Sequence, residues 1–213
     1  MTTATVFIVD DDPGIRESLP VLMETAGLKA ECFASAEAFL DSCGHDQEGC
    51  LLLDVRMPGL SGPQLQVELA RRKIGLPVIF LTAYADLATG VDAMKQGAMD
   101  FLTKPVNGAL LLQRVQAALA LDRERRHIDG ARQALLSRLQ KLSGRERDVL
   151  ALALTGTASR EIAERLRISL RTVEGHRARI YLKTGSASLL ELSRTASDLG
   201  LSVSDITALS LTR

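Results

Sequence analysis

Five side chains suited to phosphoryl chemistry lie near the ends of apolar runs in the first half of the sequence. They are Asp10 and Asp11 after the first run, Asp54 near the end of the third, Thr82 closing the fourth and Lys104 after the fifth. Neighbouring carboxylates repel one another, and all-oxygen ligands favour Mg²⁺ over zinc as the cation that relieves this repulsion. With Mg²⁺ bound, Asp54 is an oxygen nucleophile towards a phosphoryl group, and Lys104 and Thr82 bind phosphoryl oxygens.

Each carboxylate taken alone has a simpler explanation. It is a solvated strand end or a helix cap, and Asp12 before Pro13 and Gly14 is expected to cap the first helix. A phosphatase of the haloacid dehalogenase kind is an alternative that would also use Asp54 as nucleophile. That chemistry requires a second acid two residues later, and in this sequence the residue at that position is Arg56. We therefore favour a phosphorylation site over an enzyme with its own small-molecule substrate.

Alternating strands and helices are expected to position these side chains. The predicted strands are Thr5–Val9, Ala30–Phe33, Leu51–Val55, Val78–Thr82 and Phe101–Thr103. The predicted helices are Gly14–Ala26, Ala36–Cys43, Pro63–Arg72, Leu87–Gln96 and one from Gly108 onward. This order predicts an α/β domain over residues 1–120, with a doubly wound, five-stranded parallel sheet. Such sheets bind ligands at the carboxyl ends of their strands, where the five side chains are expected to meet.

The segments IVDDD, LLLDVRMPGLSG, LTA and DFLTKP, in this order, resemble the receiver domain of two-component response regulators. The resemblance implies that Asp54 takes a phosphoryl group from a sensor histidine kinase. It also implies that Asp10, Asp11, Asp54 and the backbone carbonyl of Arg56 hold Mg²⁺. In the family Thr82 and Lys104 contact the phosphoryl group.

Three further features follow from the receiver resemblance alone. Phe101 corresponds to an aromatic switch that turns inward when Thr82 moves to the phosphate. Ala83 corresponds to a small residue that keeps the site accessible, and the Lys104–Pro105 peptide bond is expected to be cis.

The second half of the sequence predicts a linker helix and a small all-α domain. Residues 121–141 show a charged helical pattern, with a flexible tether as the alternative. Residues 142–200 then predict a helix-turn-helix domain, and residues 201–213 a weak final helix or a frayed tail. Ser143 with Glu146 forms the capping-box pattern that opens the first helix. A short helix over Arg160–Leu166, a tight turn and a helix over Leu170–Lys183 complete the motif.

The third of these helices is expected to enter the major groove of duplex DNA. Its spacing places Val173, Ile180 and Thr184 on the face towards the core. The candidate DNA-binding residues are Arg171, Thr172, Glu174, Gly175, His176, Ala178, Arg179 and Lys183. We expect Arg171 and Arg179 to pair with guanine or phosphate and Glu174 to accept from cytosine, with His176 and Lys183 at the rim. Arg177 is expected to contact a phosphate or an internal acid.

The stretch from LSGRERDVL to YLKTG resembles the LuxR/NarL-type effector domain over roughly residues 140–200. The order of receiver, linker and effector resembles the FixJ-type branch, and within it the regulators of aromatic-hydrocarbon breakdown. The resemblance implies a transcriptional regulator, expected to be an activator, that forms a homodimer on phosphorylation and works with RNA polymerase. Gly175 departs from the Val often found there. An adaptor that binds RNA or protein is the alternative function.

The two halves of the sequence differ in net charge, which agrees with different functions for the two. Residues 1–120 hold 9 basic and 15 acidic residues, a net charge of −6, and residues 121–213 hold 17 and 11, a net charge of +6. An acidic half joined to a basic half indicates that the second half binds a polyanion. No apolar run reaches the roughly 18 residues of a membrane span, and no signal peptide is evident, so we expect a cytoplasmic protein without membrane partners. The three cysteines are expected to be reduced thiols.

Overall fold

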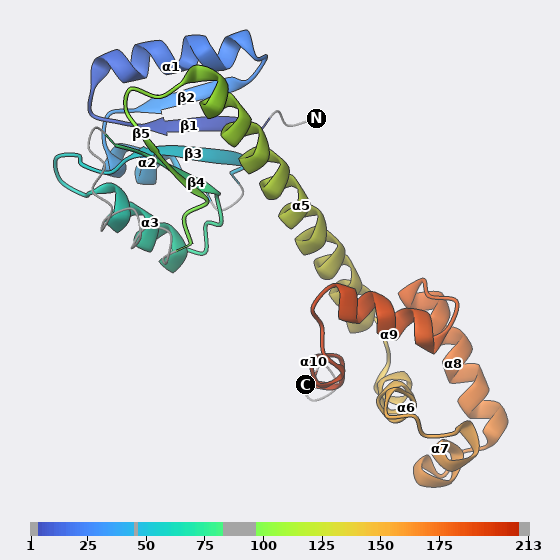
Figure 1. The fold of residues 1–213 in the computed structure, drawn as a ribbon. Coiled ribbons are helices and arrows are strands. Elements are labelled where there is room, and N and C mark those ends of the chain that lie inside the picture. Colours follow the sequence, from blue (N-terminus) through green and yellow to red (C-terminus); the bar gives the residue numbers. More distant parts are fainter. Residues whose placement is uncertain (1–3, 45–46, 83–96, 209–213) are drawn as a thin grey trace. The chain divides into compact units, whose positions relative to one another are not determined.

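A computed structural model describes residues 4–44, 47–82 and 97–208 of the chain (Figure 1). The chain divides into two compact units, Met1–Arg125 and Arg126–Arg213. In the described part of the chain, no helix is both long enough and apolar enough to cross a bilayer.

The first unit is built on a five-stranded parallel sheet with the strand order β2-β1-β3-β4-β5. The strands are β1 (Thr5–Val9), β2 (Lys29–Phe33), β3 (Gly49–Asp54), β4 (Val78–Thr82) and β5 (Asp100–Thr103). The predicted doubly wound sheet is therefore confirmed, with the bounds of β2, β3 and β5 shifted by one or two residues. Strands β1, β3 and β4 are buried along their whole length, as expected for central strands that are covered on both faces.

Helices cover both faces of this sheet (Figure 1). Helix α1 (Pro13–Thr25) and the start of α5 (Gly108–Gln140) pack on one face, where Ile8, Leu52 and Leu111 are fully buried. Helices α2 (Ala36–Ser42) and α3 (Gly62–Arg71) pack on the other, against Leu53 and Phe80. The predicted helix Leu87–Gln96 and the small residue Ala83 lie outside the described residues.

Local capping explains where these helices begin. The Asp12 carboxylate accepts a hydrogen bond from the Gly14 backbone N–H at 2.8 Å, and Pro13 occupies the first turn, where its missing N–H costs nothing. The predicted cap at Asp12 is confirmed. Ser35 caps α2 in the same way, through the Ala38 N–H at 3.2 Å.

Strand β3 begins at a glycine that contacts the backbone of β1. Gly49 has φ of +145°, and a Cβ there would lie 1.8 Å from the Thr5 carbonyl oxygen, so no other residue fits without a backbone shift. The Gly49 N–H donates to the buried Asp122 carboxylate at 2.9 Å. Asp122 belongs to α5, and its other oxygen accepts from Arg125 at 2.6 Å. This carboxylate ties α5 to the start of the central strand.

Helix α5 runs without interruption from Gly108 to Gln140. A helix was expected over residues 121–141, and these residues are helical as part of α5 up to Gln140. The two ends of α5 pack into different cores. Its residues Leu119 and Asp122 are buried in the first unit, whereas Leu135 and Leu139 belong to the core of the second.

The second unit is all-helical. It contains the end of α5 followed by α6 (Gly144–Leu154), α7 (Ser159–Leu166), α8 (Leu170–Thr184), α9 (Leu189–Asp198) and α10 (Val203–Ala208). The Ser143 capping box of α6 is confirmed, with the Glu146 carboxylate accepting from the Ser143 N–H at 2.8 Å. Of the two alternatives expected from residue 201, a final helix and a frayed tail, the structure has the helix, α10, and Leu201 and Ile206 belong to the core of this unit. Both are apolar positions that the Ser- and Thr-rich composition concealed.

Candidate functional site

Three of the predicted side chains meet at the carboxyl edge of the sheet. Lys104 Nζ donates to Asp10 Oδ2 at 2.6 Å and to Asp54 Oδ1 at 2.7 Å. Asp10 follows β1, Asp54 ends β3, and Lys104 follows β5, so three strands bring them together. Asp10 is 1% exposed and Asp54 6% exposed, and this burial strengthens the electrostatic attraction between the ammonium and both carboxylates.

Burial and pairing act in opposite directions on this cluster. Burial raises the pKa of Asp54, and hydrogen bonds from Lys104 and from the Arg56 N–H offset only part of the rise. Burial also opposes the charge of Lys104. Its hydrogen bonds to Asp10 and Asp54 outweigh that effect and raise the pKa of Lys104, which stays charged at neutral pH. One ammonium is thus paired with two buried carboxylates.

The other predicted receiver residues lie around this cluster. Thr82 is buried at the end of β4, and its carbonyl accepts from the Lys104 N–H at 2.6 Å. The Arg56 N–H donates to Asp54 Oδ2 at 2.8 Å. The backbone of Arg56, whose carbonyl is expected to bind Mg²⁺, therefore lies beside the Asp54 carboxylate. Asp11 is exposed next to Asp10. Phe101 is half-buried, with its ring 6.5 Å from that of Phe80. The Lys104–Pro105 bond is cis, as expected.

The donor set suits Mg²⁺. Asp10, Asp11 and Asp54 offer hard oxygen ligands, and Mg²⁺ in proteins is commonly held by one or two carboxylates with water in the remaining positions. Two buried carboxylates with one ammonium leave negative charge for a cation to neutralise. Within the residues that the structure describes, no three acidic, His or Cys side chains are already arranged as metal ligands.

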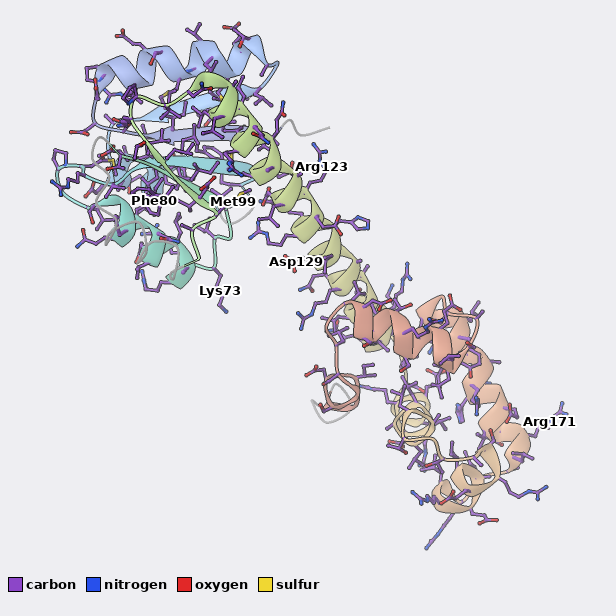
Figure 2. All side chains as sticks on the ribbon, in the orientation of Figure 1. Lys73, Phe80, Met99, Arg123, Asp129 and Arg171 are labelled. Atoms are coloured by element: carbon purple, nitrogen blue, oxygen red, sulfur yellow. The ribbon has the colours of Figure 1, made fainter. Side chains whose placement is uncertain are left out.

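The exposed face of α8 carries most of the candidate DNA-binding residues. Arg171, Glu174, Ala178 and Arg179 are exposed, and Figure 2 shows Arg171 projecting away from the helix. The opposite face is the predicted one, with Val173, Ile180 and Thr184 all buried. Gly175 is half-buried, and a Cβ there would meet no atom of the described residues within 4 Å.

Two of the candidates are engaged within the protein. The Thr172 hydroxyl lies 2.7 Å from the Ser169 hydroxyl, which caps α8 by accepting from the Thr172 N–H at 3.0 Å. Lys183 was expected at the rim of the DNA interface. Instead, its Nζ donates to Glu146 Oε2 at 2.6 Å and to the Lys141 carbonyl at 3.2 Å. Lys183 therefore connects α8 to the start of α6.

Arg177 joins the two helices of the helix-turn-helix. Its guanidinium donates to the Ser159 hydroxyl at the start of α7 at 3.0 Å, and to the Tyr181 hydroxyl, one turn further along α8, at 3.0 Å. An internal acid or a phosphate was expected here, and the partners in the structure are two hydroxyl groups. The neighbouring His176 is half-buried, and its buried Nδ1 has no hydrogen-bond partner among the residues that the structure describes.

Two known families match the two units. The response regulator receiver domain family matches residues 6–116, which include Asp10, Asp54 and Lys104. The luxR family of bacterial regulatory proteins matches residues 140–196, which include α6, α7 and α8.

Whole-length relatives combine the same two parts. The transcriptional regulatory protein TdiR of Thauera aromatica is 46% identical over 89% of this chain and 83% of its own length. FixJ of Azorhizobium caulinodans is 42% identical over 94% of this chain and 95% of its own length. The solved structure of the response regulator StyR is 40% identical, covers 92% of this chain and 100% of its own, and superposes with a TM-score of 0.84. The chain therefore belongs to the response regulators, with a receiver domain and a DNA-binding domain of the luxR family, and is homologous to the transcriptional regulators FixJ and TdiR.

Proposed function

We propose that this response regulator is switched on by phosphorylation of Asp54 and then binds promoter DNA as a homodimer. The observation that carries the proposal is the buried Asp54 carboxylate at the end of the central strand, paired through Lys104 with Asp10. The receiver family supports a histidine kinase as the phosphoryl donor, and the luxR family supports duplex DNA as the target.

In the proposed transfer an Asp54 carboxylate oxygen attacks the phosphorus of a phosphohistidine. The new P–O bond forms as the P–N bond breaks, and the imidazole nitrogen keeps the electron pair of that bond. Lys104 already donates to Asp54 and Asp10, and in this role it neutralises charge on the arriving phosphoryl oxygens. The Thr82 hydroxyl binds a further phosphoryl oxygen, and Phe101 follows the movement of Thr82.

Mg²⁺, when bound, would neutralise charge on the phosphoryl oxygens. The residues proposed to hold it are Asp10, Asp11, Asp54 and the backbone carbonyl of Arg56. The Arg56 backbone is already beside Asp54, because its N–H is bonded to that carboxylate.

For the output we propose that α8 reads the major groove through Arg171, Glu174, Gly175, Ala178 and Arg179, with His176 and Thr172 at its margin. We do not place Lys183 among these contacts, since it is bonded to Glu146. We propose residues 1–120 as the receiver, 121–141 as the linker and 142–200 as the DNA-binding domain. As an activator the dimer would recruit RNA polymerase. Beyond the phosphoryl transfer to itself, we propose no enzyme activity.

The experiment is incorporation of acid-labile phosphate from acetyl phosphate, compared among the parent chain, Asp54→Asn and Asp12→Asn. The parent and Asp12→Asn should label, because Asp12 is a helix cap and Asn serves that role as well. Asp54→Asn should not label, and EDTA should abolish labelling of the parent. Undiminished labelling of Asp54→Asn would refute the site, and labelling that survives EDTA would refute the metal requirement.

A further inference from the structure

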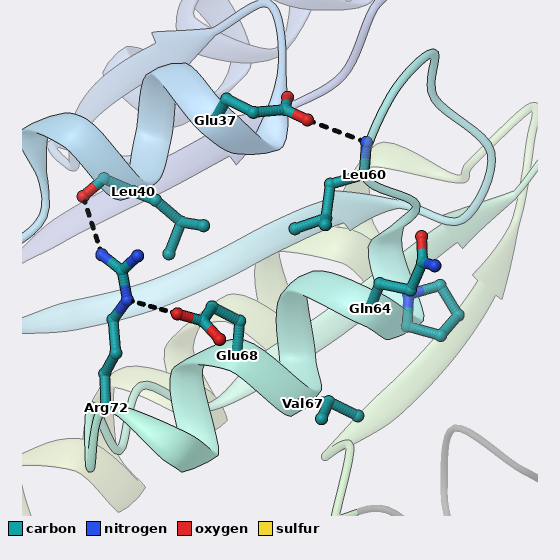
Figure 3. Close-up of a pocket in the computed structure, with 8 residues that line it drawn as sticks. Glu37, Leu40, Leu60, Gln64, Val67, Glu68 and Arg72 are labelled. Carbon is teal, nitrogen blue, oxygen red and sulfur yellow. Dashed lines mark hydrogen bonds and ion pairs between the residues drawn. The ribbon is translucent and has the colours of Figure 1, made fainter.

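The connection between β3 and α3 is held by a carboxylate from a different helix. Glu37, in the first turn of α2, accepts a hydrogen bond from the Leu60 N–H at 2.9 Å (Figure 3). Leu60 belongs to the segment 55–61, which begins directly after Asp54. Glu37 thus contacts the chain that leads away from the proposed phosphorylation site.

Two glycines near the start of α3 let this connection approach its neighbours closely. Gly62, whose N–H donates to the Val55 carbonyl at 3.1 Å, would place a Cβ 2.2 Å from the Asp54 carbonyl oxygen. Gly59 has φ of +75°, and a Cβ there would lie 2.7 Å from Glu37 Oε1. Both close approaches are possible because the two residues are glycines. The backbone therefore passes close to the end of β3 on one side and to the Glu37 carboxylate on the other.

The charge on Glu37 suits this contact. Hydrogen bonds from its own N–H and from the Leu60 N–H lower the pKa of the Glu37 carboxyl, so the group is a carboxylate at neutral pH. A hydrogen bond to a charged acceptor is stronger than one between neutral groups. The contact therefore restrains Leu60, four residues beyond Arg56, whose N–H is bonded to Asp54 Oδ2.

We propose that Glu37 is a positioning residue for Mg²⁺-dependent phosphorylation, acting through Leu60 to fix the backbone around Arg56. The inference rests on the proposed function of Asp54. Mg²⁺ demands near-ideal octahedral geometry, so a ligand carbonyl on a loosened loop would bind it less well. Glu37 touches none of the reacting groups itself.

Glu68 provides a matched control. It lines the same pocket between α2 and α3 as Glu37, and its removal changes the net charge equally. Its carboxylate accepts from Arg72 at 2.7 Å (Figure 3) and from Arg71 at 2.7 Å, rather than from the loop. A general electrostatic effect on the metal site would therefore appear in Glu68→Ala as well.

The test measures amide hydrogen exchange at Leu60 in the full-length, Mg²⁺-free protein, and the Mg²⁺ concentration that half-saturates phosphorylation by acetyl phosphate. Glu37→Ala and Glu37→Asp should speed Leu60 exchange about tenfold and raise half-saturating Mg²⁺ roughly threefold, with the saturating rate little changed. Glu37→Asp retains the charge and the helix-start preference but is too short to reach Leu60. Glu37→Gln, which keeps an acceptor oxygen but loses the charge, should lie between the parent and Glu37→Ala. Glu68→Ala should resemble the parent.

Parent-like exchange of Leu60 in both Glu37→Ala and Glu37→Asp would overturn the contact. Faster exchange with an unchanged Mg²⁺ requirement would overturn the positioning role, as would an equal change of that requirement in Glu68→Ala. A parent chain that takes no phosphate would instead defeat the proposed function. The exchange measurement is independent of phosphorylation, so the two failures are distinguishable.

Discussion

Replacing Lys183 by Met tests whether this side chain holds the DNA-binding domain together or contacts DNA. The substitution keeps most of the side-chain length but removes the ammonium that donates to Glu146 Oε2 at 2.6 Å. Glu146 is 2% exposed, and it would keep its hydrogen bond from the Ser143 N–H. The carboxylate would then be buried without a cationic partner.

The expected loss follows from the geometry of the pair. A hydrogen bond to a charged group contributes about 1.5–3 kcal/mol. The Lys183 side chain is 36% exposed, so solvent screens part of this interaction, and we expect a loss of about 1–2 kcal/mol. For a unit of this size, such a loss lowers the unfolding temperature by roughly 4–16 °C.

The pH dependence has a defined sign. Burial opposes ionisation of Glu146, but hydrogen bonds from Lys183 and the Ser143 N–H outweigh it and lower the pKa of Glu146. A lowered carboxyl pKa gives stability that is fully present above the unfolded value of about 4.3 and is lost as the pH falls through the folded value. The difference between the parent and Lys183→Met should therefore shrink in acid.

The loss of stability in Lys183→Met is measured by thermal unfolding, followed by circular dichroism. Amide exchange at Val149 and Ile180 reports on the core of the second unit. Lys141→Met is the matched control, because the Lys141 side chain is exposed and its backbone carbonyl is what Lys183 contacts. Unchanged stability of Lys183→Met together with weakened DNA binding would refute the reasoning and return Lys183 to the DNA interface.

Two further substitutions test the packing. Gly175→Ala should stabilise the second unit by about 0.5–1 kcal/mol, because the added Cβ meets nothing within 4 Å and glycine weakens a helix interior; a lower unfolding temperature would contradict the structure of α8. Asp122→Ala should destabilise the first unit by about 1–3 kcal/mol, because it leaves the Gly49 N–H without its acceptor. Urea unfolding measures the second effect, and a change below about 0.5 kcal/mol would show that the buried carboxylate is dispensable.

Much of the receiver site was predictable because its positions are set by the topology. A side chain at the end of a buried parallel strand lies at one edge of the sheet, so Asp10, Asp54 and Thr82 could be placed together without coordinates. Which groups pair was not predictable. Lys104 was expected to meet a phosphoryl group, and in the structure its flexible side chain bridges Asp10 and Asp54.

The missed contacts depend on residues distant in sequence. The capping-box pattern predicted the hydrogen bond between the Glu146 carboxylate and the Ser143 N–H. It gave no indication that Lys183, 37 residues later, would donate to the same carboxylate. Arg177 was expected to contact a phosphate or an internal acid, whereas its hydroxyl partner Ser159 comes from the packing of α7 against α8. Asp122 looked like one more charge in a polar helix, because nothing in its local sequence indicates burial against Gly49.

The most direct test of the account is the affinity of the full chain for duplex DNA before and after treatment with acetyl phosphate and Mg²⁺. Duplexes selected from a random pool supply the target, and fluorescence anisotropy measures the binding in the parent chain and in Asp54→Asn. The account predicts a gain of about tenfold or more in the parent and none in Asp54→Asn, since the coupling between sites depends on that phosphoryl group. An equal gain in Asp54→Asn, or tight binding in both chains that phosphorylation leaves unchanged, would contradict it.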